Sequence, residues 1–276
     1  MIHVPALLTP AGLCLTAPNW HEVGVQTGAF CLGELLQKPG LERLMHAPPL
    51  AQLLGWEGEI ILNASSLRMN RSGLYAHQSR FDGTRMTYSV LEIFHVIAAL
   101  KPQRVILPHG FYAYDSSLWH ALPEHTKVYF PCNDCPTTAS SRWFGVMVDS
   151  LEAPEQCEQG VDIYVMADLN RTEVARAAAL GVAYLENNQP AHDGMNGIMY
   201  TAGGDFDLTQ AAYAQDFTPL DVSCVCPTCR AGLTRAYLHH LLQHTPLLCQ
   251  RFLIQHNTMI NFSLNGANST TFFTNA

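Results

Sequence analysis

Three cysteines near the C-terminal end of the chain have the residue type and spacing of a metal site. Cys224, Cys226 and Cys229 lie close together in the sequence Cys-Val-Cys-Pro-Thr-Cys. Thiolate sulfur and imidazole nitrogen are the ligands that zinc prefers in tetrahedral sites, so a fourth donor is needed. The downstream candidates for that donor are His239, His240, His244, Cys249 and His256. A zinc ion with four protein ligands would be structural, because no position is left open for water.

The helix expected over residues 235–244 limits this choice. Its sequence, RAYLHHLLQH, has apolar residues at helical spacing. His239 and His240 are adjacent in it and must face different sides of the helix. At most one of these two histidines can therefore point toward the cysteine loop.

The remaining cysteines do not indicate a disulfide framework. The chain has nine cysteines, an odd number, and its N-terminal residues 1–5 lack the basic start of a signal peptide. Cys132 and Cys135 form a Cys-x-x-Cys pair between two prolines, but no second ligand pair lies nearby in the sequence. We therefore expect a cytoplasmic protein with reduced thiols, in which the C-terminal trio binds the metal.

The composition predicts a soluble, folded protein without the usual features of a nucleic-acid binder. Hydrophobic residues make up 48% of the 276 residues, which is enough to bury a sizeable core. No apolar run reaches the roughly 18 residues that span a bilayer. The formal net charge is −8, and the chain has no basic run, whereas nucleic-acid binders cluster lysine and arginine against phosphates.

The elements that must position the candidate ligands alternate between strands and helices. Continuous apolar runs separated by helices are typical of parallel strands buried on both faces, and hence of a barrel or a doubly wound sheet. The expected strands are 58–63, 104–108, 127–131, 143–148, 163–167 and 182–185. The expected helices are 91–100, 115–122, 172–180 and 235–244. Segment 1–18 has turn residues between apolar stretches and is expected to form a hairpin.

Residues 216–257 strongly resemble the C-terminal zinc region of the tRNA-guanine transglycosylases. That family places a Cys-x-Cys-x-x-Cys loop before an Arg-Ala-Tyr-Leu-His-His helix and takes its fourth zinc ligand from a later His-Asn pair. The resemblance implies that Cys224, Cys226, Cys229 and His256 bind a structural zinc ion.

The resemblance also implies a fold and a domain organisation. We expect an α/β chain with a (β/α)₈ TIM-type barrel over 1–215, a zinc-binding subdomain with the final helix over 216–262, and a flexible tail over 263–276. Weaker matches, such as the Lys-Pro-Gly at 38–40 and the Phe-Gly-Val-Met at 144–147, extend the similarity over most of the chain. The chain is shorter than the bacterial enzymes after Pro18 and between Ser150 and Val161, so one or two barrel units are expected to be missing or abbreviated.

The family's active positions can be located by the same resemblance, and each of them is altered. Where the enzymes attack the ribose C1′ with an aspartate, this chain has Glu186, and a displacement of about 1 Å can cost on the order of 10²-fold in rate. Asn63 replaces the second catalytic aspartate, and an amide cannot exchange a proton as a carboxylic acid can. His109 and Val148 fall where the family recognises the base with an aspartate and a glutamine.

These losses predict a catalytically inactive, zinc-containing pseudoenzyme that acts as a scaffold or as a subunit of a protein complex. A bacterial type IV secretion coupling complex is one assembly of this kind. We expect protein partners in a homo- or hetero-oligomer, and the deficit of basic residues argues against tRNA as a partner. The alternative is an active tRNA-guanine transglycosylase that exchanges guanine for a 7-deazaguanine base with Glu186 as the nucleophile. A third hypothesis is that the altered pocket binds another nucleobase or metabolite.

Overall fold

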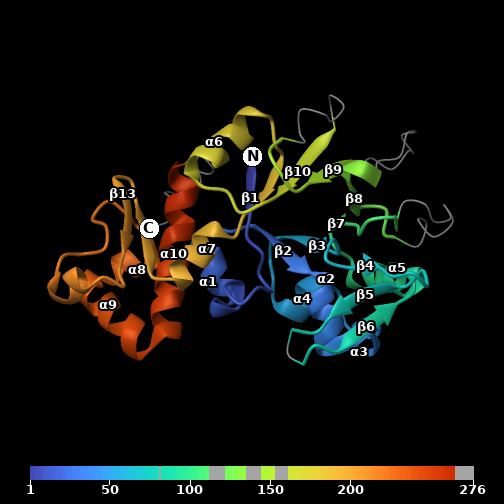
Figure 1. Ribbon diagram of the computed structural model, residues 1–276, viewed down its shortest axis with the longest axis horizontal. Helices are drawn as coiled ribbons and strands as arrows, with labels where there is room; N and C mark the ends of the chain where they lie inside the picture. Colours follow the sequence, from blue (N-terminus) through green and yellow to red (C-terminus); the bar gives the residue numbers. More distant parts are fainter. Residues whose placement is uncertain (81, 112–121, 135–143, 153–160, 265–276) are drawn as a thin grey trace.

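Eight parallel strands form the centre of the computed structural model, which describes residues 1–80, 82–111, 122–134, 144–152 and 161–264 (Figure 1). From β2 to β11, each strand pairs in parallel with the next barrel strand along the chain, and β1 pairs in parallel with β11. The strands are β1 (Ile2–Val4), β2 (Thr27–Cys31), β3 (Glu59–Asn63), β7 (Arg104–Ile106), β8 (Lys127–Pro131), β9 (Phe144–Val148), β10 (Asp162–Met166) and β11 (Tyr184–Glu186).

The ring of strands closes between β1 and β2. Ala6 forms a parallel bridge with Ala29, and the Ala29 amide donates to the Pro5 carbonyl at 3.0 Å. This order and direction define an eight-stranded α/β barrel and exclude a doubly wound open sheet. All eight strands are present, so the barrel lacks none of its strands, and the shortening expected after Pro18 and between Ser150 and Val161 stays a prediction. Residues 132–143 are all that join β8 to β9, and residues 149–161 are all that join β9 to β10.

Alternate residues of the strands fill the barrel in layers, because side chains of a strand change face at every residue. A middle layer comprises Val4, Ala29, Ile61, Ile106, Tyr129, Met147, Tyr164 and Tyr184. Two residues earlier in the strands, an ion pair joins Arg104 to Glu59 with an Nε–Oε1 distance of 2.6 Å. Two residues later, at the C-terminal ends of their strands, lie Asn63, Met166 and Glu186.

Helices connect several of the barrel strands, and the start of α5 and the end of α6 have clear sequence causes. α5 begins after Ser89, whose hydroxyl accepts from the Glu92 amide while the Glu92 carboxylate accepts from the Ser89 amide. α6 ends just before Gly181, which adopts a φ of +75° that favours glycine. The helices are α1 (Ala17–Glu22), α2 (Leu32–Leu35), α3 (Leu41–Met45), α4 (Leu50–Leu54), α5 (Val90–Leu100), α6 (Arg171–Ala179) and α7 (Gln189–Met195).

A three-stranded antiparallel sheet interrupts the barrel order between β3 and β7. Its strands are β4 (Arg68–Met69), β5 (Tyr75–Gln78) and β6 (Arg85–Tyr88), paired in that order. Tyr75 and Tyr88 are buried and opposite one another, so one face of this sheet packs against the barrel side of the molecule.

The C-terminal part of the described chain builds a second, smaller core. It contains β12 (Ile198–Thr201), β13 (Gly204–Asp207), α8 (Pro227–Arg230), α9 (Arg235–His244) and α10 (Pro246–Leu264). Its buried side chains are Met199, Leu208, Leu220, Leu238, Leu241, Cys249 and Leu253. α10 contacts α7 on one side and α8 and α9 on the other, so it connects this core to the barrel (Figure 1). No described helix is both long and apolar enough to cross a membrane.

Most elements expected from the sequence are confirmed to within two residues, including the six strands and the helices at 91–100, 172–180 and 235–244. The hairpin expected over 1–18 is wrong. Ile2–Val4 instead forms a barrel strand parallel to β11, and a short 3₁₀ turn and α1 follow it. The apolar residues of this segment are buried by closing the ring rather than by pairing with each other. Almost all of the helix expected over 115–122 and of the tail expected over 263–276 lies outside the described residues, as does Cys135.

Candidate functional site

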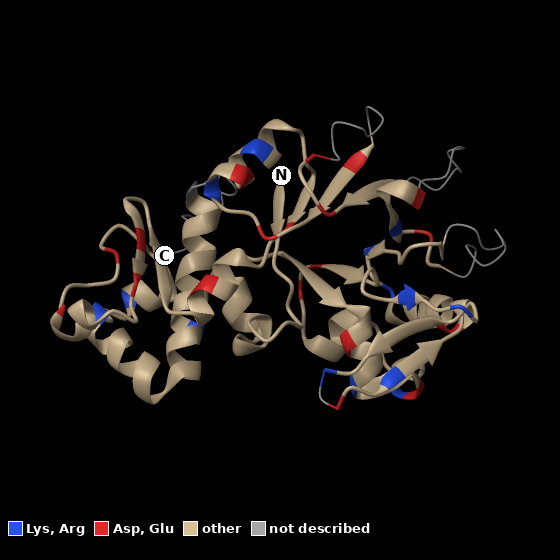
Figure 2. Ribbon diagram, viewed as in Figure 1, with Lys and Arg blue, Asp and Glu red and all other residues tan. Residues whose placement is uncertain are grey.

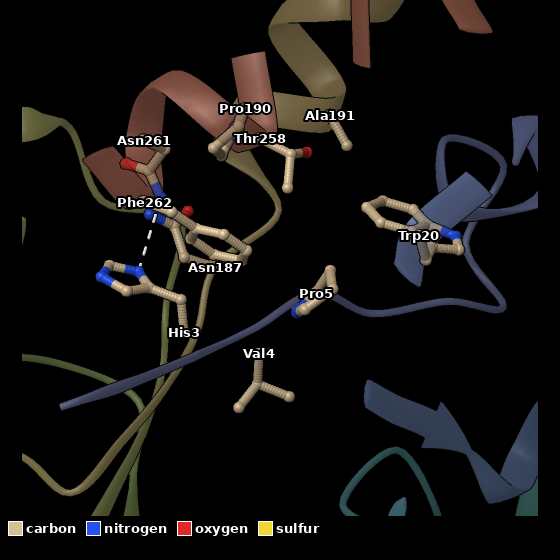
Figure 3. A pocket seen from close by; sticks show the side chains of 10 residues that line it. All are labelled: His3, Val4, Pro5, Trp20, Asn187, Pro190, Ala191, Thr258, Asn261 and Phe262. Atoms are coloured by element: carbon tan, nitrogen blue, oxygen red, sulfur yellow. Dashed lines mark hydrogen bonds between the residues drawn. The ribbon is translucent and has the colours of Figure 1, made fainter. Parts of the chain in front are cut away.

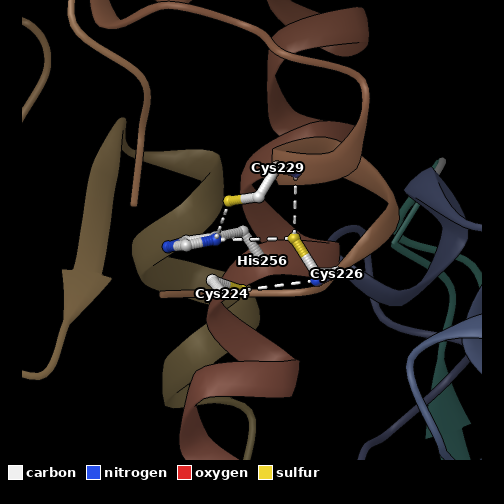
Figure 4. Close-up of side chains that lie close together, drawn as sticks. All are labelled: Cys224, Cys226, Cys229 and His256. Atoms are coloured by element: carbon white, nitrogen blue, oxygen red, sulfur yellow. Dashed lines mark hydrogen bonds between the residues drawn. The ribbon is translucent and has the colours of Figure 1, made fainter. Parts of the chain in front are cut away.

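The four side chains implied by the resemblance lie together at the start of α8 and in the middle of α10 (Figure 4). Their ligand atoms, three Sγ and one nitrogen of His256, lie within 4.8 Å of one another. Cys226 precedes α8 and accepts a hydrogen bond from the Cys229 amide at 3.3 Å, so the tight turn of this short helix brings the sulfurs together. Hydrogen bonds with Cys224 and Cys229 hold the pKa of the Cys226 thiol well below its usual range, which favours the thiolate that binds metals.

The separations of these atoms fit the edges of a tetrahedron around one metal ion. His256 Nδ1 lies 3.6 Å from the Cys226 Sγ and 3.3 Å from the Cys229 Sγ. Zinc bonds of about 2.3 Å to sulfur and about 2.0 Å to nitrogen give a sulfur–nitrogen edge of about 3.6 Å. The donor set of three sulfurs and one imidazole, without a carboxylate, is the one that zinc prefers.

Groups behind the four ligands fix their orientation. The Nε2 atom of His256 lies 2.7 Å from the Tyr200 carbonyl, so the other ring nitrogen is left for the cysteine side. This arrangement sets the tautomer of a ligating histidine. The Thr228 hydroxyl donates to the Phe252 carbonyl at 2.9 Å and ties α8 to α10.

The other candidates for the fourth ligand lie elsewhere. His239 is buried with its Nδ1 2.7 Å from the Leu208 carbonyl. His240 packs against His244 with ring centroids 4.3 Å apart. Cys249 donates its thiol to the Leu238 carbonyl inside the second core. Among the described residues, the only group of His, Cys, Asp and Glu close enough to hold a metal ion is the Cys₃His cluster.

A second polar cluster occupies the C-terminal mouth of the barrel, where α/β-barrel proteins carry their active sites. Here the structure brings Asn63 and Glu186 together, from strands on different sides of the ring. Asn63 Nδ2 donates to Glu186 Oε2 at 2.9 Å, and the Tyr164 hydroxyl donates to the same oxygen at 2.8 Å. Ser65 holds the Asn63 side chain in place, because the backbone amide and the hydroxyl of Ser65 both donate to Asn63 Oδ1.

The Glu186 carboxyl is buried, with 7% of the residue exposed. Burial raises the pKa of Glu186, and the two hydrogen bonds oppose that shift because they favour the ionised form. The negative charge of Asp168 adds to the upward shift. Burial and the adjacent Glu186 raise the pKa of Tyr164 well above its usual value, so this phenol stays protonated and remains a donor.

The other two positions taken from the resemblance do not join this cluster in the described residues. The His109 side chain is half exposed, and its Nδ1 lies 3.3 Å from an oxygen of Asp134. Val148 is buried with Val165 and Leu185 in the layer between the strands and α6, rather than inside the barrel. Its neighbour Met147 is the inward residue of β9.

Sequence reasoning missed Tyr164, Ser65 and Met166, whose Sδ lies 3.2 Å from Asn63 Nδ2. Alternation along β10 is the signal that could have found Met166 and Tyr164, because they are two residues apart and face the same side.

Two cavities lie near these clusters. A pocket of about 270 Å³ opens beside the C-terminal ends of β10 and β11 and is lined by Asp168, Asn170, Arg171, Glu173, Gln189, Asp193, Tyr200 and Asp205. A smaller cavity of about 20 Å³ lies where α10 meets the N-terminal segment, between Trp20, Phe262 and His3 (Figure 3). The smaller one has room for about one water molecule.

The fold and the two clusters define the class of protein: an α/β barrel with a Cys₃His cluster in its C-terminal part that could hold a metal ion. Residues 146–266 match the family model described as queuine tRNA-ribosyltransferase, so this part of the chain is related to that family. The resemblance predicted from the cysteine-rich region is therefore confirmed there. Glu186 and the Cys₃His cluster lie within the matched residues, whereas Asn63 and His109 precede them.

Individual relatives give the same result. The chain is 36% identical to the queuine tRNA-ribosyltransferase of Sorangium cellulosum over 34% of its own length and 24% of the relative. It is 38% identical to that of Prochlorococcus marinus over 34% of its length and 25% of the relative. With the Novosphingobium aromaticivorans protein it shares 34% identity over 38% and 28% of the two chains. The matched segment thus spans about a quarter of the curated relatives it matches.

Proposed function

We propose that this protein is a non-catalytic member of the queuine tRNA-ribosyltransferase family, a zinc-stabilised barrel that serves as a scaffold or subunit of a cytoplasmic protein complex. In this proposal Cys224, Cys226, Cys229 and His256 bind a structural zinc ion. Its role is to hold the second core together, because a closed four-ligand site contributes directly to folding.

The observation that carries the proposal is the bond between Asn63 and Glu186. A carboxylate nucleophile must reach the sugar carbon that it attacks, and its partner acid must exchange a proton. Here the only carboxylate of the pair is buried and receives two hydrogen bonds on one oxygen. Its partner is an amide, which exchanges no proton. The pair therefore suits a structural role inside the barrel better than covalent catalysis.

The charge beside the barrel mouth also supports this proposal over tRNA modification. The 270 Å³ pocket is lined by four carboxylates and one cation, Arg171, among the described residues. Arg171 pairs with Asp205 and lies over the Tyr200 ring at 4.9 Å, so its charge is already compensated. A surface of this sign repels the phosphates of an RNA backbone.

Measuring base exchange is the test of inactivity. The protein is incubated with unmodified tRNA and radiolabelled guanine, and label in the tRNA is counted for the wild type and for Glu186→Gln. An active relative, such as the Sorangium cellulosum enzyme, serves as the positive control on the same tRNA. We expect background label for both forms of this protein. Incorporation by the wild type that Glu186→Gln abolishes would overturn the proposal and establish the alternative, with Glu186 as nucleophile.

Purification from the native host tests the scaffold role. We expect a tagged protein to retain defined protein partners in constant ratio after nuclease treatment; a type IV secretion coupling complex is one assembly to look for among them. Enriched tRNA without any protein partner would contradict the proposal.

A further inference from the structure

The three-stranded sheet β4–β5–β6 carries a positive charge that contrasts with the rest of the molecule. Residues 68–88 contain four arginines and a single acidic residue, Asp82, in a chain of formal net charge −8. Figure 2 shows blue segments along this sheet, at the right of the view. A local charge opposite to the net charge attracts partners that the remaining surface repels.

The strand register places two of these arginines on one exposed face. Arg68 is opposite Ala76, and Ala76 is opposite Thr87 in β6. The next same-face pair along β5 and β6 is Gln78 with Arg85. The four side chains of Arg68, Gln78, Arg85 and Thr87 are exposed. The opposite face, with Tyr75 and Tyr88, is the buried one.

Neighbouring carboxylates do not neutralise this face. Within the described part of the chain, Arg80 pairs with Glu34 at 3.0 Å, whereas Arg68, Arg71 and Arg85 have no carboxylate partner. Arg68 donates to the Ser65 carbonyl, which orients its side chain without cancelling its charge. Arg71 is exposed in the turn between β4 and β5. We name Arg68, Arg71 and Arg85 the arginine face.

We propose that the arginine face docks an acidic, extended segment of a protein partner. The inference rests on the proposed function and specifies the chemistry of the partner. Guanidinium groups bind carboxylates with paired hydrogen bonds. Arg68 and Arg85 lie two strands apart and two residues out of register, which separates their backbones by about 12 Å, and same-side positions four residues apart along an extended segment are separated by about 13 Å. On the same face, Gln78 on β5 is opposite Arg85, and Thr87 lies two residues from Arg85 on β6, so both offer further hydrogen bonds.

A nucleic acid fits this face less well. The face has three unpaired cations and no lysine, and the described residues of 68–88 expose no aromatic side chain on which a base could stack. The predominantly acidic remainder of the chain would repel an extended phosphate backbone that continued beyond the sheet. A short acidic segment confined to the face avoids that repulsion.

The test uses the full chain and a fluorescein-labelled peptide of ten glutamates, followed by fluorescence anisotropy at low and high salt. We expect binding at 50 mM NaCl that is lost near 1 M, where the screening length falls to about 3 Å. Arg68→Glu/Arg85→Glu should weaken binding by about tenfold or more, because like charges then face the peptide. The matched control is Lys101→Glu/Arg251→Glu, which reverses two exposed cations outside the sheet and should leave binding unchanged. Thermal unfolding of each variant checks that it remains folded.

Three results would overturn the inference: no peptide binding at low salt, equal loss in both double variants, or tighter binding of tRNA than of the peptide at the same arginines. Its failure can be told apart from that of the proposed function. If a native protein complex survives the Arg68→Glu/Arg85→Glu change, docking at the arginine face is refuted while the scaffold role stands. If purification from the native host yields no protein partner, the scaffold role fails, whether or not the glutamate peptide binds.

Discussion

Replacing Tyr164 by phenylalanine removes one of the two donors that hold the Glu186 carboxylate. The bond is 2.8 Å long and lies between two buried groups. The ring itself stays packed between Tyr129 and Tyr184, so little more than one oxygen is lost. Hydrogen bonds to charged groups contribute about 1.5–3 kcal/mol. We expect the free energy of unfolding in urea at pH 8 to fall by that amount.

The loss of unfolding free energy should depend on pH, and the direction of the pKa shift of Glu186 decides at which pH the loss is larger. The bond from Tyr164 lowers the pKa of Glu186, against a larger upward effect of burial, so Tyr164→Phe raises this pKa further. An acid whose folded-state pKa lies above its unfolded value of 4.5 destabilises the fold as the pH rises through the folded pKa. The difference between wild type and variant should therefore be larger at pH 8 than at pH 5.

The same substitution in a Glu186→Gln background isolates the interaction. There the hydroxyl would face a neutral amide, and the loss should be about 0.5–1.5 kcal/mol, which leaves a coupling energy of about 1 kcal/mol. Tyr129→Phe is the matched control, since Tyr129 lies in the same layer but bonds to Arg104. Equal losses in both backgrounds, or at both pH values, would refute the assigned role of the Tyr164–Glu186 bond.

Three further predictions concern the metal, the mouth and the packing of the barrel. Cys226→Ser should abolish binding of one zinc ion per chain, measured by elemental analysis, and lower Tm strongly, because structural zinc contributes about 10 kcal/mol or more to folding. Asn63→Asp should place a second carboxylate near Glu186 Oε2, raise the pKa of the pair and destabilise the protein more at pH 8 than at pH 5, as measured by urea unfolding. Gly145→Ala would bring a Cβ within 2.2 Å of the Tyr129 ring, so it should lower the free energy of unfolding by about 1–3 kcal/mol.

Each of these three predictions has a control variant. Cys14→Ser changes a cysteine outside the metal cluster and should leave the zinc content unchanged. Gly203→Ala adds a methyl group whose nearest neighbour is 3.9 Å away and should be nearly neutral. Asn63→Ala removes the donor without adding charge, so a pH dependence as steep as that of Asn63→Asp would contradict the predicted repulsion.

The sequence predicts the barrel strands best where apolar residues are continuous. Lys127–Pro131 is one example, and both of its ends were predicted. β2 was missed because its residues, TGAFC, include small side chains that give a weak apolar signal. The parallel partner of Ile2–Val4 could not be predicted from local pattern, because that pairing depends on β11, far away in the chain.

The two candidate sites differ in how far residues that are close together in the sequence are enough to predict them. The three cysteines lie within one turn, so their spacing alone predicts a metal site, and the choice of His256 over His239 came from the family resemblance. The bond between Asn63 and Glu186 joins residues 123 positions apart and depends on ring closure. Side chains alternate between the two faces of β9. Because Met147 points into the barrel, its neighbour Val148 points outward.

The closure between β1 and β2 has a consequence for the order of folding. β1 has two strand neighbours: β2, close in sequence, and β11, whose register joins Ile2 to Tyr184. Contacts at such long sequence separation form late and slow folding. While the chain is being synthesised, β1 and β2 can meet early, but the outer edge of β1 stays unpaired until residues 184–186 emerge. Until that pairing forms, the nascent barrel is an open sheet with an exposed edge along β1, and such an edge can pair with other chains.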